Sequence, residues 1–151
     1  MTESRRIRLL AAVATVGVAA LAFGGCSSTD TAEQVSTCTD LQSLAKEFRG
    51  LRDVDVARTG LDGLESQTNA VSDAWGQAKT TGEQQFGKEL DAFDASLENL
   101  RTTLRSASDK GSSIGETASA VRSDISKISA SWTDLTKAVD GELKDCDLSG
   151  K

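Results

Sequence analysis

Thiols and carboxylates are the side chains of this sequence that could do chemistry, because it contains no histidine and no tyrosine. Without histidine the chain lacks the commonest general base and the commonest metal ligand. Two closely spaced acidic pairs, Asp91 with Asp94 and Asp145 with Asp147, have the residue type for acid–base catalysis. A solvated acidic surface explains them more simply. No phosphate-binding loop, nucleophile elbow or cluster of metal ligands accompanies them, so we expect a protein that is not an enzyme and needs no cofactor or metal.

The N-terminal segment has the pattern of a secretory signal peptide over 1–25. Arginines among the first eight residues precede an apolar run over 9–23, which is short of the roughly 20 residues that a membrane-spanning helix needs. The run ends in Phe23-Gly24-Gly25-Cys26, which resembles the lipobox of bacterial lipoproteins. The resemblance implies cleavage before Cys26, a diacylglyceryl thioether on its sulfur, and acylation of the new amine by chains such as palmitate.

Two alternatives stay open for this segment. An ordinary secretory signal would leave Cys26 without a lipid. Ser4-Arg5-Arg6 also resembles the opening of a twin-arginine signal, so the general and the twin-arginine export routes both remain possible.

The other two cysteines, Cys38 and Cys146, bracket most of the remaining chain. In an oxidising extracytoplasmic space such a pair predicts a disulfide. Two cysteines without histidine are too few for a metal site. The bridge would enclose a helical domain over 38–146, which follows a polar, flexible tether over 26–37 and precedes a C-terminal tail over 147–151.

The region between these cysteines is expected to be helical, because apolar residues recur along it at alternating steps of three and four. The helices would then hold the two cysteines in position. The longest run comprises Ile114, Ala118, Val121, Ile125, Ile128, Trp132, Leu135, Val139 and Leu143. Runs of this kind predict helices over 39–52, 54–80, 83–108 and 113–143. Capping boxes are expected at Thr39, Thr81 and Ser113, each of which is followed three residues later by Gln or Glu. Asp53 or Asp55 is placed to cap the second helix.

These helices predict an all-α fold, for which two architectures compete. The first is an antiparallel four-helix bundle with a break near Gly82, and short connections favour it. The second is a long helical hairpin, in which the middle helices fuse into a rod and the outer two lie end to end against it. Helix lengths favour the rod, because it would bring Cys38 directly to Cys146. We predict the bundle and keep the rod as the alternative.

The two tryptophans distinguish these architectures. Both lie on apolar seams, so we expect Trp75 and Trp132 to be core aromatic residues. In the bundle the two side chains share a core layer. In the rod, Trp132 lies near Leu90, and Trp75 is about 22 Å further along.

The overall pattern resembles small secreted or lipid-anchored proteins of actinobacteria, in which a signal peptide precedes a helical domain with cysteine near each end. The resemblance implies a place at the extracytoplasmic face of the cell membrane, and it transfers no functional residue. The net charge of −6 argues against nucleic acid as a partner. We therefore expect a non-enzymatic interaction or structural module of the cell envelope. Its expected partners are the membrane, through the lipid on Cys26, and another envelope protein.

Two other functions remain open, as does the oligomeric state. A small-ligand carrier or sensor would need a cavity between helices, and the small residues Thr68, Ala78 and Ala118 leave room for one. A prophage-encoded lipoprotein that excludes superinfecting phages would also have this size, anchor and helical composition.

Overall fold

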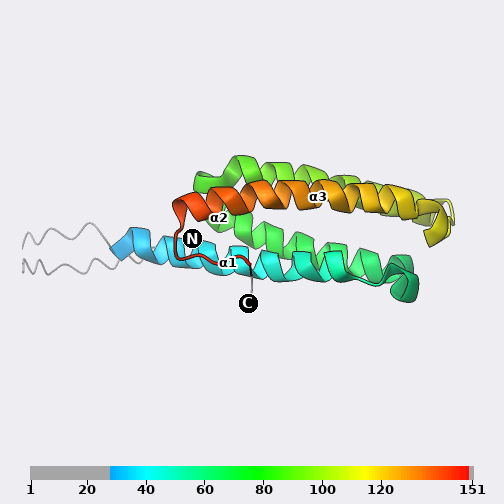
Figure 1. The fold of residues 1–151 in the computed structure, drawn as a ribbon, viewed down its shortest axis with the longest axis horizontal. Helices are drawn as coiled ribbons and strands as arrows, with labels where there is room; N and C mark the ends of the chain where they lie inside the picture. Colours follow the sequence, from blue (N-terminus) through cyan, green and yellow to red (C-terminus); the bar gives the residue numbers. More distant parts are fainter. Residues whose placement is uncertain (1–27, 150–151) are drawn as a thin grey trace, which may run out of the picture.

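The structure is a computed structural model that describes residues 28–149. It contains α1 over Ser28–Asp53, α2 over Val56–Asp109 and α3 over Ile114–Glu142 (Figure 1). No strand occurs between residues 28 and 149, and the all-α prediction is confirmed. None of the helices in this range is long and apolar enough to span a membrane. The predicted signal peptide and Cys26 lie outside the described residues.

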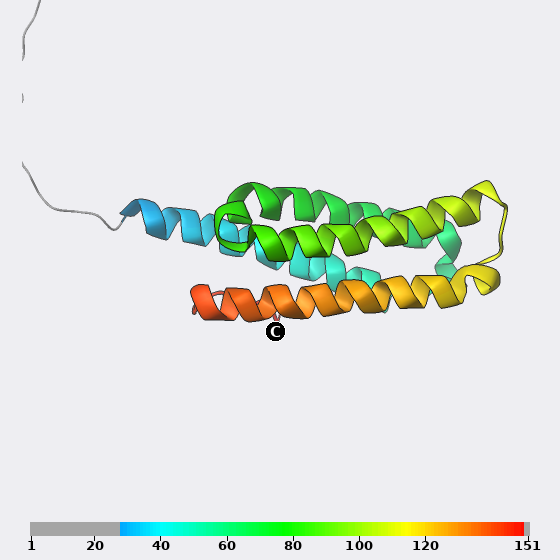
Figure 2. The ribbon, with the colours of Figure 1, turned by 90° about the horizontal axis from the view of Figure 1, so that it is seen from above.

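α2 reverses its direction near its middle. At Phe86 the backbone has φ −125° and ψ 18°, outside the helical region, and the chain turns back there (Figure 2). The indole Nε1 of Trp75 donates to the carbonyl oxygen of Leu90 at 3.1 Å. A straight helix would hold these two residues about 22 Å apart. The predicted alternative of a straight rod is therefore wrong.

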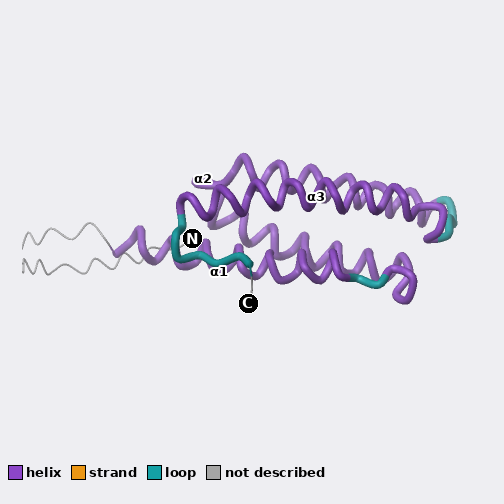
Figure 3. The backbone as a smooth tube through the Cα atoms, in the orientation of Figure 1, coloured by secondary structure: helices purple, strands orange, loops and turns teal. Residues whose placement is uncertain are grey.

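The reversal lies beyond the break that the sequence predicted at Gly82, and the backbone between the two positions is helical. Figure 3 accordingly draws α2 as helix without a loop inside it. The predicted capping box at Thr81 is wrong, because Thr81 lies inside α2, where its hydroxyl donates to a carboxylate oxygen of Asp40 on α1 at 3.0 Å. Gly82 is buried, and a Cβ there would lie 3.4 Å from Cγ2 of Thr37. A side chain at this position would be in ordinary van der Waals contact with α1, so Gly82 lies where α1 packs against α2 and does not end a helix.

α1 begins inside the segment 26–37, for which the sequence predicted a flexible tether. The chain has no proline, and the first glycine of α1 is Gly50, so nothing interrupts the helix early. Thr37 is buried, and its hydroxyl donates to the carbonyl oxygen of Thr81 at 2.9 Å. The prediction of a flexible tether is therefore wrong from Ser28 onward, because the chain is already helical there, and Thr37 at the end of the segment is held against α2.

Capping interactions account for the other helix ends. The carboxylate of Asp55 accepts a backbone N–H of the first turn of α2 at 3.2 Å, as predicted. Gly111 follows α2 with φ +60°, a conformation that glycine adopts at little cost. The capping box at Ser113 is confirmed, because the Glu116 carboxylate accepts from the Ser113 N–H at 2.8 Å. The predicted box at Thr39 is wrong, because Thr39 lies inside α1.

The capping box of α3 leads to an expected pH dependence. The backbone N–H of Ser113, and then its hydroxyl, donate to Glu116 and lower the pKa of this carboxyl from its ordinary value of 4.5. Because the folded pKa is lowered, the stabilisation is complete above pH 4.5 and is lost as the pH falls through the folded pKa. Carbon NMR should show Glu116 titrating below pH 4.5, and in Ser113→Ala the midpoint should return only part of the way, since the backbone N–H remains. A wild-type midpoint at or above 4.5 would contradict this assignment.

An aromatic cluster joins all three helices at the core. Phe48 of α1 and Phe93 of α2 are buried and meet edge to face, with ring centroids 5.9 Å apart. Trp132 of α3 lies 5.4 Å from Phe48 and 6.0 Å from Phe93 and is half-buried. Trp75 is likewise half-buried against the core, where its N–H reaches the backbone beyond the reversal. The three-ring cluster therefore contributes a contact between all three helices within the core.

Candidate functional site at the disulfide end

A disulfide joins Cys38 on α1 to Cys146, which follows the end of α3. The two sulfurs are 2.13 Å apart and the Cα atoms 5.6 Å apart, so the predicted pairing is confirmed. The linked residues are 108 positions apart, and the bond therefore encloses nearly the whole helical domain.

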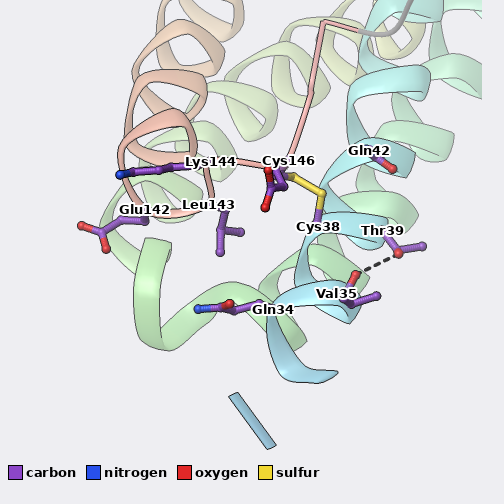
Figure 4. A pocket seen from close by; sticks show the side chains of 10 residues that line it. Gln34, Val35, Cys38, Thr39, Gln42, Glu142, Leu143, Lys144 and Cys146 are labelled. Atoms are coloured by element: carbon purple, nitrogen blue, oxygen red, sulfur yellow. Dashed lines mark hydrogen bonds between the residues drawn. A yellow bond between two sulfur atoms is a disulfide. The ribbon is translucent and has the colours of Figure 1, made fainter. Parts of the chain in front are cut away.

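A cavity of about 530 Å³ opens beside this disulfide (Figure 4). It is lined by Gln34, Val35, Cys38, Thr39, Gln42, Glu142, Leu143, Lys144, Asp145 and Cys146. One wall therefore comes from α1, and the other comes from the end of α3 and the residues after it. Val35 is 61% exposed, which is unusual among the large apolar side chains of the described region. Glu142, Lys144 and Asp145 add charges of both signs, so the cavity combines apolar and charged surface.

The chain after α3 forms a strap, which we define as residues 143–149. Gln42 and Arg49 of α1 donate side-chain hydrogen bonds to two strap carbonyls, at 3.3 and 2.8 Å. Leu148 is 5% exposed and belongs to the hydrophobic core. The sequence placed 147–151 outside the folded domain as a tail, and Leu148 shows that the domain extends further. A single leucine after the last helical period gave no periodic signal by which to find it.

Lys79 connects the two antiparallel parts of α2 beside Trp75. Its ammonium lies 5.2 Å from the ring centroid of Trp75 and 2.8 Å from a carboxylate oxygen of Asp91. The hydrogen bond to Asp91 raises the pKa of Lys79. Asp91, one half of the possible acid–base pair with Asp94, is therefore engaged in an exposed ion pair.

A second cavity, of about 350 Å³, lies between the two parts of α2. It is lined by Glu65, Thr68, Asn69, Glu98, Arg101, Leu104, Arg105, Ser108 and Asp109. Of the three small residues expected to border a gap, Thr68 lines this cavity. Ala78 is fully buried in the core and Ala118 is half-buried, and neither lines it. Most of the side chains around the cavity are polar or charged.

Sequence reasoning missed one buried carboxylate, Asp124 of α3, which is 5% exposed. It accepts a hydrogen bond from the hydroxyl of Thr103 on α2 at 2.6 Å and pairs with Lys127 at 3.0 Å. Asp124 follows the buried Val121 by three residues, which is a seam position. The spacing could have revealed it, but charged side chains are ordinarily solvated and therefore do not count toward an apolar seam.

The chemistry available at the disulfide end is therefore that of a sulfur–sulfur bond beside an open cavity. Among residues 28–149, no three histidine, cysteine, aspartate or glutamate side chains are grouped to hold a metal ion. Cys26, the predicted lipidation site, lies outside the described residues, two positions before α1 begins. Comparison of the chain with protein-family models, with curated proteins and with solved structures finds no match.

Proposed function

We propose that this chain is an exported lipoprotein, held at the extracytoplasmic face of the cell membrane by acyl chains on Cys26. Its helical domain acts as a non-enzymatic interaction module of the cell envelope. The Cys38–Cys146 disulfide carries the proposal, because such bonds persist in extracytoplasmic compartments and are rare in the cytosol. The arginines and the apolar run before Cys26 support export independently.

We further propose that the domain works as an antiparallel four-helix bundle, composed of α1, the two parts of α2 on either side of Phe86, and α3. Support comes from contacts that bridge the two parts of α2, including a hydrogen bond between Arg101 and Ser72. Ser96 and Ser131 lie with their hydroxyl oxygens 2.9 Å apart and connect the second part of α2 to α3. Small hydroxyl side chains at this contact let the two helices approach closely.

The start of α1 suggests how such a domain would be oriented. Cys26 precedes Ser28 by two positions, so an anchor there would join the domain almost directly at the start of α1. The disulfide end would then face the bilayer. The connections from α1 to α2 and from α2 to α3 lie at the opposite end, where another envelope protein would have access (Figure 1). The net negative charge of the chain favours a partner with a basic contact surface.

Replacement of Cys26 by serine is expected to release the protein from membranes. Two or more acyl chains anchor a protein stably, and the substitution removes the sulfur that would bear the diacylglyceryl group. The measurement is immunoblotting of membrane and soluble fractions after an alkaline wash, with the full chain expressed in a bacterial host that processes lipoproteins. The double variant Cys38→Ser/Cys146→Ser is the matched control and should stay with the membrane. If Cys26→Ser still sediments with membranes, the anchoring account is wrong.

A small-ligand carrier is the second candidate, and the 530 Å³ cavity is the observation that favours it. This volume lies within the range of about 300–1,000 Å³ that is typical of ligand sites. Native mass spectrometry of the purified protein distinguishes the two functions, because a carrier would retain a small molecule and an interaction module would not.

A further inference from the structure

We propose that the 350 Å³ cavity between the two parts of α2 binds a small zwitterion of dipeptide size, which carries an ammonium group at one end and a carboxylate at the other. The inference goes beyond the proposed function, because it depends neither on a lipid at Cys26 nor on the cavity beside the disulfide. It rests on how the cavity is formed, on which of its charged side chains are unpaired, and on how far apart those charges lie.

A small residue on the buried seam of α2 leaves the cavity open. Thr68 is 1% exposed and lies on this seam between Leu64 and Val71, which are both fully buried. Its side chain is shorter than that of leucine, and its hydroxyl donates back to the Leu64 carbonyl oxygen at 2.7 Å. Leu104, from the second part of α2, is also buried and lines the cavity. The site therefore has buried surface from both parts of α2 beneath a polar rim.

Arg101 bridges the two parts of α2 beside the cavity. Its guanidinium donates to a carboxylate oxygen of Glu98 at 3.3 Å and to the hydroxyl of Ser72. A guanidinium carries five N–H donors, so these two contacts leave donors for a ligand. Because the side chain is already held in place, binding costs it little further entropy. Arg101 is thus positioned to receive a carboxylate, the group that a guanidinium binds most strongly.

The remaining charged side chains of the lining are Arg105, Glu65 and Asp109, and no side-chain hydrogen bond or ion pair within residues 28–149 engages them. The two carboxylates would repel a simple anion, and the two arginines would repel a simple cation. No three potential metal ligands are grouped in this part of the chain to hold a metal ion. A molecule with one charge of each sign is therefore the ligand class that this lining favours.

The spacing of the unpaired charges sets the size of the ligand. Arg105 and Asp109 are four residues apart on α2, which places their Cβ atoms about 5–6 Å apart on one helix face. Two residues of extended peptide span about 7 Å. The carboxylate of a dipeptide can therefore lie at Arg101 and Arg105 while its ammonium lies at Asp109 and Glu65. A free α-amino acid carries both groups on one carbon and is too short to reach both.

The position of the cavity leaves it open to a ligand. Asp109 ends α2 at the connection to α3, which lies at the end of the domain opposite the disulfide (Figure 2). In the proposed orientation this end points away from the bilayer. The volume of about 350 Å³ lies at the lower end of the range of about 300–1,000 Å³ for ligand sites, as expected for a small molecule.

NMR titration of the nitrogen-15-labelled full chain tests the proposal, with alanyl-alanine as the probe. N-acetyl-alanyl-alanine lacks the ammonium, alanyl-alanine amide lacks the carboxylate, and free alanine tests the length. Arg105→Gln and Glu65→Gln each remove one charge from an exposed side chain, so the fold should not change. Arg122→Gln is the matched control, because Arg122 is exposed on α3 and does not line the cavity.

Alanyl-alanine is expected to shift the amides of residues 101–109 saturably and to bind about tenfold more tightly than either blocked derivative or alanine. Arg105→Gln and Glu65→Gln should each weaken binding about fivefold or more, while Arg122→Gln should change it less than about twofold. The proposal is overturned if these amides show no saturable shift up to about 10 mM alanyl-alanine. It is also overturned if a blocked derivative or alanine binds as tightly, or if Arg122→Gln weakens binding as much as Arg105→Gln. None of these outcomes bears on membrane anchoring, which Cys26→Ser tests separately.

Discussion

Loss of the Cys38–Cys146 disulfide is expected to lower the melting temperature of the helical domain by about 10–20 °C. The bond joins residues 108 positions apart, and cross-linking so long a loop removes much of the entropy of the unfolded chain. For a loop of this length the chain-entropy model gives about 4.7 kcal/mol, which is an upper-end figure. In this model the effect acts chiefly on the unfolded state.

Circular dichroism melts of oxidised protein, reduced protein and the double variant Cys38→Ser/Cys146→Ser measure this effect. The reduced protein and the double variant should melt at the same temperature, because both lack the bond. Cys26→Ser is the matched control, since it removes a cysteine outside the bridge. A shift of less than about 3 °C in the double variant would mean that the bond contributes little to stability.

Replacement of Phe93 by alanine is expected to cost about 3–5 kcal/mol of unfolding free energy. Phe93 is fully buried, and its ring contacts Phe48 and Trp132, so the change leaves a cavity where all three helices meet. Contacts between aromatic rings add about 0.5–1.5 kcal/mol per pair beyond the buried area. The substitution therefore removes both a large buried side chain and two aromatic contacts at once.

Urea denaturation followed by the fluorescence of the tryptophans gives the free energy directly. Phe93→Leu fills most of the volume and should cost much less than the alanine variant. Val35→Ala is the surface control, and because Val35 is 61% exposed its effect should be within about 0.5 kcal/mol. A cost below about 1 kcal/mol for Phe93→Ala would show that the aromatic cluster is not the centre of the fold.

The helices and the disulfide could be predicted from the sequence. The helices depend on the spacing of nearby residues, and the disulfide depends on the number and positions of the cysteines. Apolar residues at steps of three and four line one face of a helix whatever surrounds it, which is why the seams correctly include Phe93 and Val121. The capping box at Ser113 needs only neighbours in sequence. The pairing of Cys38 with Cys146 followed from there being two cysteines at opposite ends of the helical region.

The predictions that failed depended on contacts between distant segments. Thr81 and Gly82 have the residue types of a helix break, but α1 packs against them and the chain turns back at Phe86 instead. The strap is held by α1 and the disulfide, and Leu148 alone gives no periodic pattern. Asp124 is buried because Thr103 and Lys127 satisfy its carboxylate, and neither partner can be assigned from sequence alone.

Intact-mass spectrometry of the native protein tests the central claim most directly. We predict a chain that begins at Cys26, carries a diacylglyceryl group with or without an added amide-linked acyl chain, and lacks two hydrogens because Cys38 and Cys146 are bonded. A chain that retains its first 25 residues, or one that begins at Cys26 with an unmodified sulfur, would contradict the account.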